Sequence, residues 1–231
     1  MRASTFHTKV NVTHVGTATA ILDIDGVTFL TDPFFSTAGH TWSFANDTLR
    51  VTENPALRLD QLSHIDAVLL SHENHPENLD ELGRQLLDGR HVMTTEDGAR
   101  NLAPRPSVLG FKDWQEREVR IAGRNYTITA TPTAHWPGHE EDIGKIADKY
   151  SITVALINLG KATVDSLKIT MDGKQAARLF RDLKAGALVP LHYESWKHFT
   201  QHGDGLSKEF ADEGIADKVC WLKPGQAVKA N

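Results

Sequence analysis

The chain has 231 residues, a formal net charge of −5, 40% hydrophobic residues and 24% charged residues. This composition is typical of a globular protein, and the acidic balance gives no reason to expect nucleic acid or an anionic membrane surface as a partner. The single cysteine, Cys220, excludes an internal disulfide and a structural zinc site built from thiolates. No signal peptide is recognisable and the apolar runs are too short to span a bilayer, so we expect a cytoplasmic protein that does not enter the membrane.

Three short β-like runs open the chain, at residues 9–15, 17–25 and 27–31. Asp25-Gly26 is a strong tight-turn signal and predicts a hairpin between the second and third runs. Residues 34–58 are polar, irregular and rich in aromatics, which predicts a surface loop. Its aromatic side chains either pack the loop onto the domain, which we favour, or line a substrate pocket.

The remaining elements are predicted from periodicity, capping residues and turn signals. Strands are expected at 66–71, 90–94, 108–111, 118–121, 126–131, 152–159, 187–191 and 219–222, and helices at 78–87, 96–102, 141–149, 173–184 and 206–213. Thr170 or Asp172 can cap the helix at 173–184. The order is β-rich then βαβα, twice, with no linker between the halves. We therefore expect one domain over residues 1–231 with an internal pseudo-repeat.

Histidines follow three of the predicted strands. The stretch Ser71-His72-Glu73-Asn74-His75-Pro76-Glu77-Asn78-Leu79-Asp80 joins a buried strand to a helix, and His135 and His192 follow two later strands. Loops at the carboxyl ends of strands are where α/β folds usually build sites. If these strands lie side by side, their imidazoles can surround one or two metal ions, as a hydrolytic centre requires.

Five segments together resemble the metallo-β-lactamase superfamily, and within it the branch similar to ascorbate-6-phosphate lactonase. They are residues 13–18, 30–34, 69–80, 131–135 and 189–193. The resemblance implies an α/β four-layer αββα sandwich with a metal site on one edge. It also implies His72, His75, Glu77, His135 and His192 as metal ligands, with zinc as the expected ion, manganese or iron as alternatives, and one or two ions bound.

The first family motif is altered. The family pattern is His-x-His-x-Asp-His, whereas the loop here is one residue longer. His72 takes the first histidine position, His75 the second, Glu77 the aspartate position and Asn78 the third histidine position. Asparagine is a poor zinc ligand, although harder ions accept it. Asn78 also fits a capping box with Glu81, and we expect helix capping to be its main role.

A second departure follows His135. The family places a strand there that ends in Gly-Asp-Thr, and its aspartate bridges the two metals. Here the chain runs through residues 136–142 directly into a predicted helix. We interpret this as an internal loss that removes one or two strands of the second sheet. Glu140, Glu141 and Asp142 are expected to complement the helix dipole rather than replace the aspartate. Exposed sheet edges predict low stability, or a homo-oligomer that covers the gap.

The other candidates have weaker signals. His14, Asp32 and Asn78 could orient ligands through hydrogen bonds, although Asp32 before Pro33 fits a turn residue equally well. Trp136 and Trp196 could wall a pocket or pack in the core. The histidines without such context are expected at the surface, and they are His7, His40, His64, His91, His139, His198 and His202.

The leading hypothesis is a metal-dependent hydrolase of a small molecule, either a lactone, another ester or a phosphoester. Glu77 would be a ligand or would orient the attacking water. The alternative is a catalytically degenerate relative that binds a ligand or partner without turnover, motivated by Asn78 and the missing aspartate. An iron-dependent redox role is a third hypothesis, against which the absence of a flavin-binding domain counts.

Overall fold

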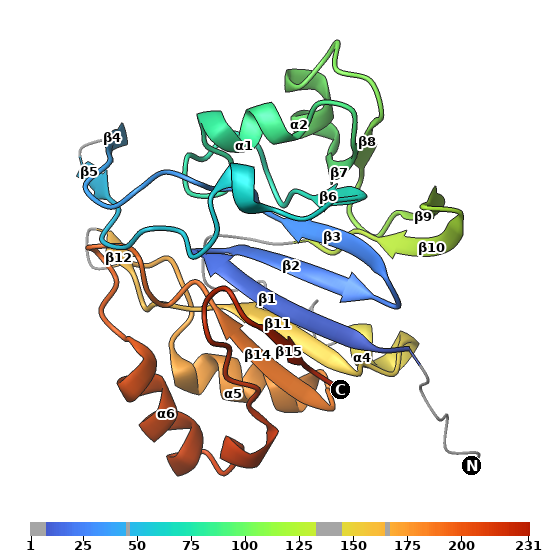
Figure 1. Cartoon of the computed structure of the whole chain (residues 1–231). Coiled ribbons are helices and arrows are strands. Elements are labelled where there is room, and N and C mark those ends of the chain that lie inside the picture. The colour runs from blue at the N-terminus through green and yellow to red at the C-terminus, as the bar shows by residue number, and fades with distance from the viewer. Residues whose placement is uncertain (1–7, 45–46, 133–144, 165–166) are drawn as a thin grey trace, which may run out of the picture.

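The computed structural model describes residues 8–44, 47–132, 145–164 and 167–231 (Figure 1). Its strands are β1 (Val10–Gly16), β2 (Thr19–Ile24), β3 (Val27–Thr31), β4 (Thr41–Phe44), β5 (Asp47–Arg50), β6 (Ala67–Leu69), β7 (His91–Thr95), β8 (Val108–Phe111), β9 (Glu116–Ile121), β10 (Arg124–Thr129), β11 (Val154–Asn158), β12 (Thr163–Val164), β13 (Leu167–Lys168), β14 (Ala187–Leu191) and β15 (Ala227–Lys229). Its helices are α1 (Glu81–Leu86), α2 (Glu96–Asn101), α4 (Ile146–Lys149), α5 (Gly173–Asp182) and α6 (Gly203–Asp212), with short 3₁₀ turns η1 (Leu59–Gln61) and η2 (Ala216–Lys218).

The largest sheet has seven strands in the order β15-β1-β2-β3-β6-β7-β8. Strands β1, β2 and β3 form antiparallel pairs, and the predicted hairpin turns at Asp25 and Gly26, both with positive φ. From β3 onward the pairs are parallel, and α1 and α2 provide the crossovers from β6 to β7 and from β7 to β8. The carboxyl ends of β3 and β6 therefore lie at the same edge.

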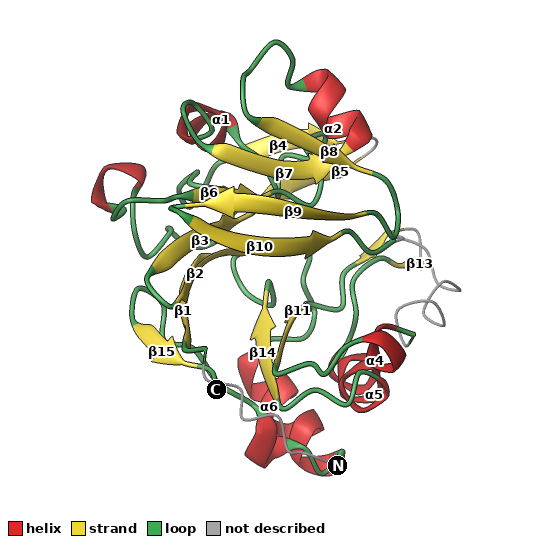
Figure 2. Cartoon of the chain, turned by 90° about the vertical axis from the view of Figure 1, so that its right-hand side faces the viewer, coloured by secondary structure: helices red, strands yellow, loops and turns green. Residues whose placement is uncertain are grey.

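A second layer faces this sheet and consists of two separate pairs, antiparallel β9–β10 and parallel β11–β14 (Figure 2). Alternate side chains from both layers meet in one core, for example Leu22 and Phe29 with Ile121 and Val189. Within the described parts of the chain, no ladder joins the two pairs of the second layer. Residues 133–144, where we predict an internal loss, lie between β10 and α4 and outside the described residues.

Helices cover both outer faces. Leu79, just before α1, and Leu86, within it, pack against Val68 and Leu70 on the outer face of the large sheet. On the opposite side, α5 and α6 pack against β11 and β14, with Phe180 and Phe210 buried there. Figure 1 shows α1 and α2 above the strands and α5 and α6 below them. The predicted four-layer αββα sandwich is confirmed.

Several local predictions are wrong. The predicted loop 34–58 contains the β4–β5 hairpin, although its aromatics Phe34 and Trp42 pack it onto the domain against Trp196, as expected. The predicted strand 219–222 is reduced to one bridge between Val219 and Leu188. Residues 227–229 instead form β15 at the free edge of β1, because the chain after η2 returns beside the amino-terminal strand. Within the part of the chain that the structure describes, no helix is long and apolar enough to cross a membrane.

Candidate active site

The predicted site residues that the structure describes gather at one edge, beyond the ends of four strands. His14 lies near the end of β1, Asp32 directly follows β3, and His192 directly follows β14. The loop 71–80 joins β6 to α1. The parallel pairing of β3 with β6 brings Asp32 beside this loop. His135 lies outside the described residues, so its place at this edge stays a prediction.

A closed hydrogen-bond network holds the start of the loop. The buried Asp32 carboxylate accepts the Ser71 backbone N–H at 2.7 Å, the Ser71 hydroxyl at 3.0 Å and the Asn78 amide nitrogen at 3.1 Å. Ser71 Oγ in turn lies 2.9 Å from Nδ1 of His72. Burial raises the pKa of Asp32 to about 6, and the hydrogen bonds from Ser71 and Asn78 oppose that rise. Asp32 is therefore an anchor for the loop rather than an isolated turn residue.

The predicted capping role of Asn78 is wrong. The N-cap of α1 is Asp80, whose carboxylate accepts the Gly83 N–H at 2.7 Å. The same carboxylate accepts the backbone N–H of Phe35 at 2.9 Å and the hydroxyl of Ser36 at 2.6 Å. Asp80 rather than Asn78 is the N-cap because its carboxylate accepts hydrogen bonds from donors on two segments at once. Asn78 is left to donate into the Asp32 and Ser71 network.

Glu77 lies between two imidazoles. Its Oε2 is 3.6 Å from Nε2 of His192, and its Oε1 is 3.5 Å from Nε2 of His198. The side chains of Glu77 and His192 are each 8% exposed. Burial raises the pKa of Glu77 to about 8. Burial also lowers the pKa of His192 to about 3, with a further contribution from the neighbouring His198, His75 and His14. Both groups are therefore neutral at pH 7.

His198 is the site residue that the sequence did not reveal, because it was predicted at the surface. It belongs to the segment after β14, which is tied to the β4–β5 insertion. The Val51–Trp196 bridge and the hydrogen bond from Lys197 N–H to the Arg50 carbonyl at 3.1 Å make this connection. Its imidazole then packs edge-on against Phe199, with ring centroids 4.8 Å apart. The only signal in the sequence is its position shortly after His192.

The turn between β1 and β2 links His14 to His192. The Thr17 carbonyl accepts Nε2–H of His14 at 3.0 Å and the backbone N–H of His192 at 3.1 Å. Burial lowers the pKa of His14, which keeps its ring neutral. Thr17, Asp32 and His192 all have positive φ, of 49°, 30° and 60°. Backbone strain of about 1–3 kcal/mol at each of three converging positions is typical of functional sites.

His72 and His75 are half-buried, and their ring centroids lie 6.0 Å apart. Glu73, between them, points away from the site. Its carboxylate binds Arg84 of α1 at 2.9 Å and Asn101 of α2 at 2.7 Å. The loop therefore presents alternate faces, with His72, His75 and Glu77 toward the site and Glu73 toward the helices.

The described residues partly fit a metal ion. The Oε1 atom of Glu77 and both ring nitrogens of His192 are buried without a hydrogen-bond partner in the described structure, as unfilled ligand atoms would be. Ligand atoms on one tetrahedral zinc ion lie about 3.4 Å apart, close to the separations of 3.5 and 3.6 Å around Glu77. However, no group of three or more His, Cys, Asp and Glu side chains in the described ranges is arranged to hold a metal.

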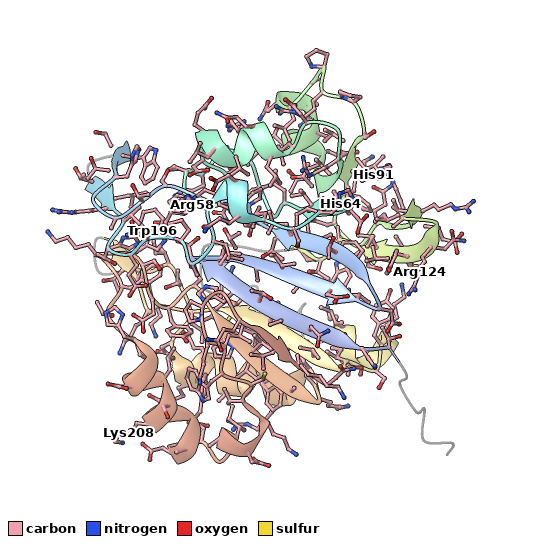
Figure 3. The ribbon with its side chains drawn as sticks, viewed as in Figure 1. Arg58, His64, His91, Arg124, Trp196 and Lys208 are labelled. Atoms are coloured by element: carbon pink, nitrogen blue, oxygen red, sulfur yellow. The ribbon has the colours of Figure 1, made fainter. Side chains whose placement is uncertain are left out.

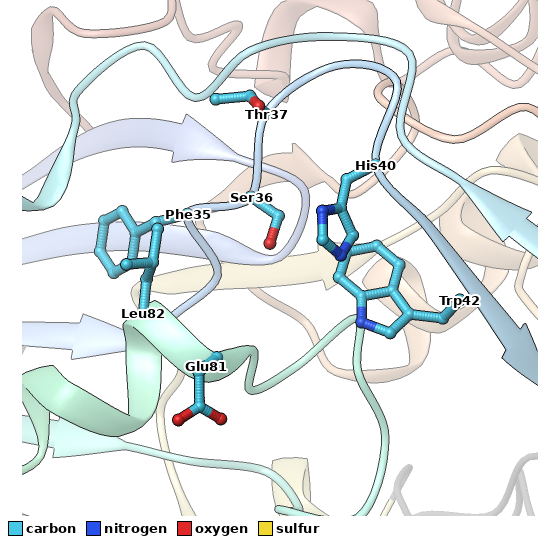
Figure 4. A pocket seen from close by; sticks show the side chains of 7 residues that line it. All are labelled: Phe35, Ser36, Thr37, His40, Trp42, Glu81 and Leu82. Atoms are coloured by element: carbon cyan, nitrogen blue, oxygen red, sulfur yellow. The ribbon is translucent and has the colours of Figure 1, made fainter.

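A small pocket of ≈ 240 Å³ opens beside the start of α1 (Figure 4). His40 packs against Trp42 with the rings tilted and their centroids 4.2 Å apart, and Phe35 and Leu82 line the other side. Trp42 packs on Trp196, which in turn lies 6.0 Å from His198 by ring centroids. Trp196 is 1% exposed, so it is a core residue that separates this pocket from the Glu77 cluster.

The other predicted surface histidines are in part confirmed. His40, His64, His91 and His202 are exposed, and Figure 3 shows His64 and His91 at the surface. His7, His139 and Trp136 lie outside the described residues, as do Glu140, Glu141 and Asp142.

No protein-family model matches the chain. A curated yeast relative, the mitochondrial N-acyl-phosphatidylethanolamine-hydrolyzing phospholipase D of Saccharomyces cerevisiae, is 28% identical over 128 residues. The match covers 49% of this chain and 25% of that protein, so the chain spans only a quarter of its relative's length.

Solved structures share the whole fold. The isothiocyanate hydrolase from Delia radicum gut bacteria superposes with a TM-score of 0.74 and 18% identity, covering 94% of this chain and 98% of the other. A possible metal-dependent hydrolase from Veillonella parvula gives 0.72 and 17%, covering 95% and 99%. The metallo-β-lactamase fold protein YhfI from Bacillus subtilis gives 0.57 and 16%, covering 96% and 99%. The chain therefore has the metallo-β-lactamase fold.

Proposed function

We propose that the chain is a metal-dependent hydrolase whose ligands come from the loop 71–80 and from the segment after β14. The observation that carries this proposal is the Glu77 carboxyl, buried between His192 and His198 at distances too long for hydrogen bonds. A buried carboxyl with a pKa of about 8 beside a neutral imidazole costs stability. Such an arrangement is typical of sites retained for binding or chemistry.

His72, His75, Glu77 and His192 would hold the metal, together with His135 from outside the described residues. A metal ion bound by such groups lowers the pKa of water and polarises a carbonyl or phosphoryl oxygen. Zinc suits this set best, because imidazole nitrogen and carboxylate oxygen are its usual ligands where thiolates are absent. The imidazole of His192 is already neutral, which leaves its nitrogen available as a ligand.

The surrounding residues orient these groups. Asp32, Ser71 and Asn78 fix the position of His72, and His14 fixes the backbone of His192 through Thr17. Glu77 would be a ligand of the metal or would orient the attacking water.

The substrate we propose is a small molecule with a phosphoester, a lactone or another ester bond. The yeast relative, a phospholipase D by name, supports placing phosphodiesters first. The pocket lined by His40, Trp42 and Leu82 lies one tryptophan away from His198 and would receive an apolar part of the substrate.

The internal loss expected after β10 belongs to the same proposal. We infer that the chain has lost the strand that would connect β10 to the β11–β14 pair, and with it the aspartate expected after His135. The two unconnected pairs of the second layer support this inference. Sedimentation of the purified chain tests the consequence, since an uncovered edge favours a dimer. A monomer with a high melting temperature would contradict the loss.

The test of function is direct. Purified protein is analysed for bound metal per chain and assayed on phosphodiester, lactone and ester substrates with and without chelator. We expect at least one bound metal ion, activity abolished by chelator, and activity restored by zinc or manganese.

The variants His72→Ala and His192→Ala should lose activity, whereas the exposed His64→Ala should retain it. Activity that survives both chelation and the paired His72→Ala, His192→Ala substitution would refute the mechanism. Neither bound metal nor turnover would favour the ligand-binding alternative.

A further inference from the structure

The Ser71 hydroxyl joins three side chains of the site. Its Oγ lies 3.0 Å from Oδ2 of Asp32, 3.1 Å from Nδ2 of Asn78 and 2.9 Å from Nδ1 of His72. The Ser71 backbone N–H, 2.7 Å from Oδ1 of Asp32, fixes the residue from the other side. The sequence indicated Asp32 and Asn78 as orienting residues but gave Ser71 no role.

The number of protons available decides the direction of each hydrogen bond. A serine hydroxyl donates one proton and accepts at two lone pairs, and the Asn78 amide nitrogen only donates. Asp32 accepts from the Ser71 backbone and from Asn78, and an ionised carboxylate at 3.0 Å from Oγ also requires the hydroxyl proton. The remaining lone pair of Oγ must then accept from His72.

The reverse direction is unfavourable. If the hydroxyl donated to His72, an oxygen lone pair of Ser71 would face Oδ2 of Asp32 without a proton between them. That arrangement requires a protonated Asp32. The pKa of Asp32, raised to about 6 by burial, leaves the carboxylate ionised at pH 7.5. The hydrogen bonds from Ser71 and Asn78 stabilise the same ionised form.

We propose that Ser71 is a positioning residue that holds His72 in the tautomer protonated at Nδ1, so that the lone pair for a metal ion is at Nε2. The Ser71 hydroxyl donates to the Asp32 carboxylate and accepts Nδ1–H of His72. Asn78 keeps the hydroxyl aligned by donating to both Asp32 and Ser71. This role explains why an asparagine, rather than a third histidine, suits position 78 in this chain. The metal part of the inference rests on the proposed function, whereas the tautomer does not.

The test measures the tautomer of His72 in the metal-free protein at pH 7.5. Long-range ¹H–¹⁵N correlation spectra of ¹⁵N-labelled protein distinguish Nδ1–H from Nε2–H, and the His72→Gln variant assigns the signals. We expect wild-type protein to show His72 protonated at Nδ1. Ser71→Ala should shift it toward Nε2–H and weaken zinc binding, measured by calorimetry, by about 10–100-fold. Ser71→Thr should retain both properties.

Ser36→Ala is the matched control, because Ser36 Oγ donates to the Asp80 carboxylate at 2.6 Å and that carboxylate bonds no histidine among the described residues. It should leave the His72 spectrum unchanged. His72 protonated at Nε2 in wild-type protein would overturn the inference, and so would a Ser71→Ala protein with unchanged spectrum and zinc affinity. If Ser71→Ala fails to fold, the wild-type spectrum and the zinc affinity of Ser71→Thr still decide. An Nδ1–H tautomer without any metal binding would refute only the proposed function.

Discussion

Two clusters of polar residues lie along the loop 71–80, and they are built in opposite ways. The anchor cluster consists of Asp32, Ser71, Asn78 and Asp80, and the ligand cluster consists of Glu77, His192 and His198. Each carboxylate of the anchor cluster accepts three hydrogen bonds between 2.6 and 3.1 Å. In the ligand cluster, the closest approach of Glu77 to either imidazole is 3.5 Å.

The difference separates structure from function within one loop. Buried polar groups that are fully hydrogen-bonded stabilise a unique fold, whereas those that are not raise the free energy of the folded state. The anchor cluster ties α1 and the segment after β3 to the end of β6. In the ligand cluster, the Oε1 atom of Glu77 and both ring nitrogens of His192 have no hydrogen-bond partner in the described structure, which is the condition expected of atoms that would hold a bound group. The same contrast gives the two clusters opposite responses to mutation.

The largest expected effect is on hydrolysis. Glu77→Gln should reduce kcat/KM by more than the roughly 10–100-fold typical of residues that only orient a ligand, because it removes the carboxylate itself. The measurement is steady-state hydrolysis of the best substrate with saturating zinc. Glu118→Gln, an exposed residue of β9, is the control and should retain wild-type activity. Equal activity of the two variants would remove Glu77 from the ligand cluster.

The largest effect on stability is expected at the base of the anchor cluster. A Cβ added at Gly83 would lie 1.9 Å from the Pro33 carbonyl oxygen, which belongs to backbone and cannot swing aside. Gly83→Ala should therefore lower the free energy of unfolding by about 3 kcal/mol, measured by urea denaturation. Gly89→Ala, where no atom lies within 4 Å of the added Cβ but φ is positive, separates steric overlap from backbone strain. A Gly83→Ala protein as stable as wild type would show that α1 is not held against this segment.

A slightly smaller loss is expected at the helix cap. Asp80→Ala removes the N-cap of α1 and leaves the buried N–H of Phe35 without an acceptor. We expect a loss of about 2–3 kcal/mol in the free energy of unfolding. Asp60→Ala, which breaks an exposed ion pair with Arg58, should leave the free energy of unfolding close to the wild-type value. Urea denaturation of both variants decides, and similar losses would contradict the anchoring role of Asp80.

In the ligand cluster, the substitution Glu77→Gln should instead increase the free energy of unfolding, and only at raised pH. The pKa of Glu77 in the folded protein, about 8, exceeds the ordinary value of 4.5, so the folded state binds more protons between these values. Its contribution to stability is complete below about pH 4.5 and is lost as pH rises toward 8. The difference in unfolding free energy between metal-free Glu77→Gln and wild type should grow by up to about 1.4 kcal/mol per pH unit, in favour of the variant.

Zinc binding tests this pH-dependent difference in stability. A metal ion competes with the proton for Glu77, so saturating zinc should abolish the pH-dependent advantage of Glu77→Gln. Parallel denaturation curves at pH 5, 6.5 and 8, with chelator and with zinc, test both statements. A difference that is constant with pH in chelator would show that Glu77 is ionised in the folded protein.

Much of the fold could be predicted from local patterns. The strand at 108–111 and the strand at 187–191 have the predicted bounds, and Asp172 caps α5 as one of the two predicted candidates. These features depend on hydrophobic period and side-chain chemistry over a few residues. The β4–β5 hairpin and β15 were missed, because short edge strands form only when a distant segment offers a partner.

The candidate site also depends on contacts with distant segments that local patterns do not predict. Asn78 and Asp80 are both good capping residues two positions apart, and only the N–H of Phe35 and the hydroxyl of Ser36 select Asp80. His198 reaches Glu77 only because Trp196 is fixed against Phe34 and Val51. No spacing in the sequence encodes either contact.

The sequence by itself determined which residues stand at the ends of the strands, and therefore which imidazoles and carboxylates could meet at one edge. Hydrophobic periodicity is a local property of the sequence, so it can be recognised without knowledge of the fold. The tertiary structure decided which of those polar groups are satisfied and which are not. Hydrogen-bond saturation depends on partners far apart in the chain, because the segment after β3 supplies Asp32 to the loop and the donors Phe35 and Ser36 to Asp80. That is why Asp32 and Asp80 became anchors for the loop, while Glu77, on the same ten-residue stretch, became the centre of the candidate site.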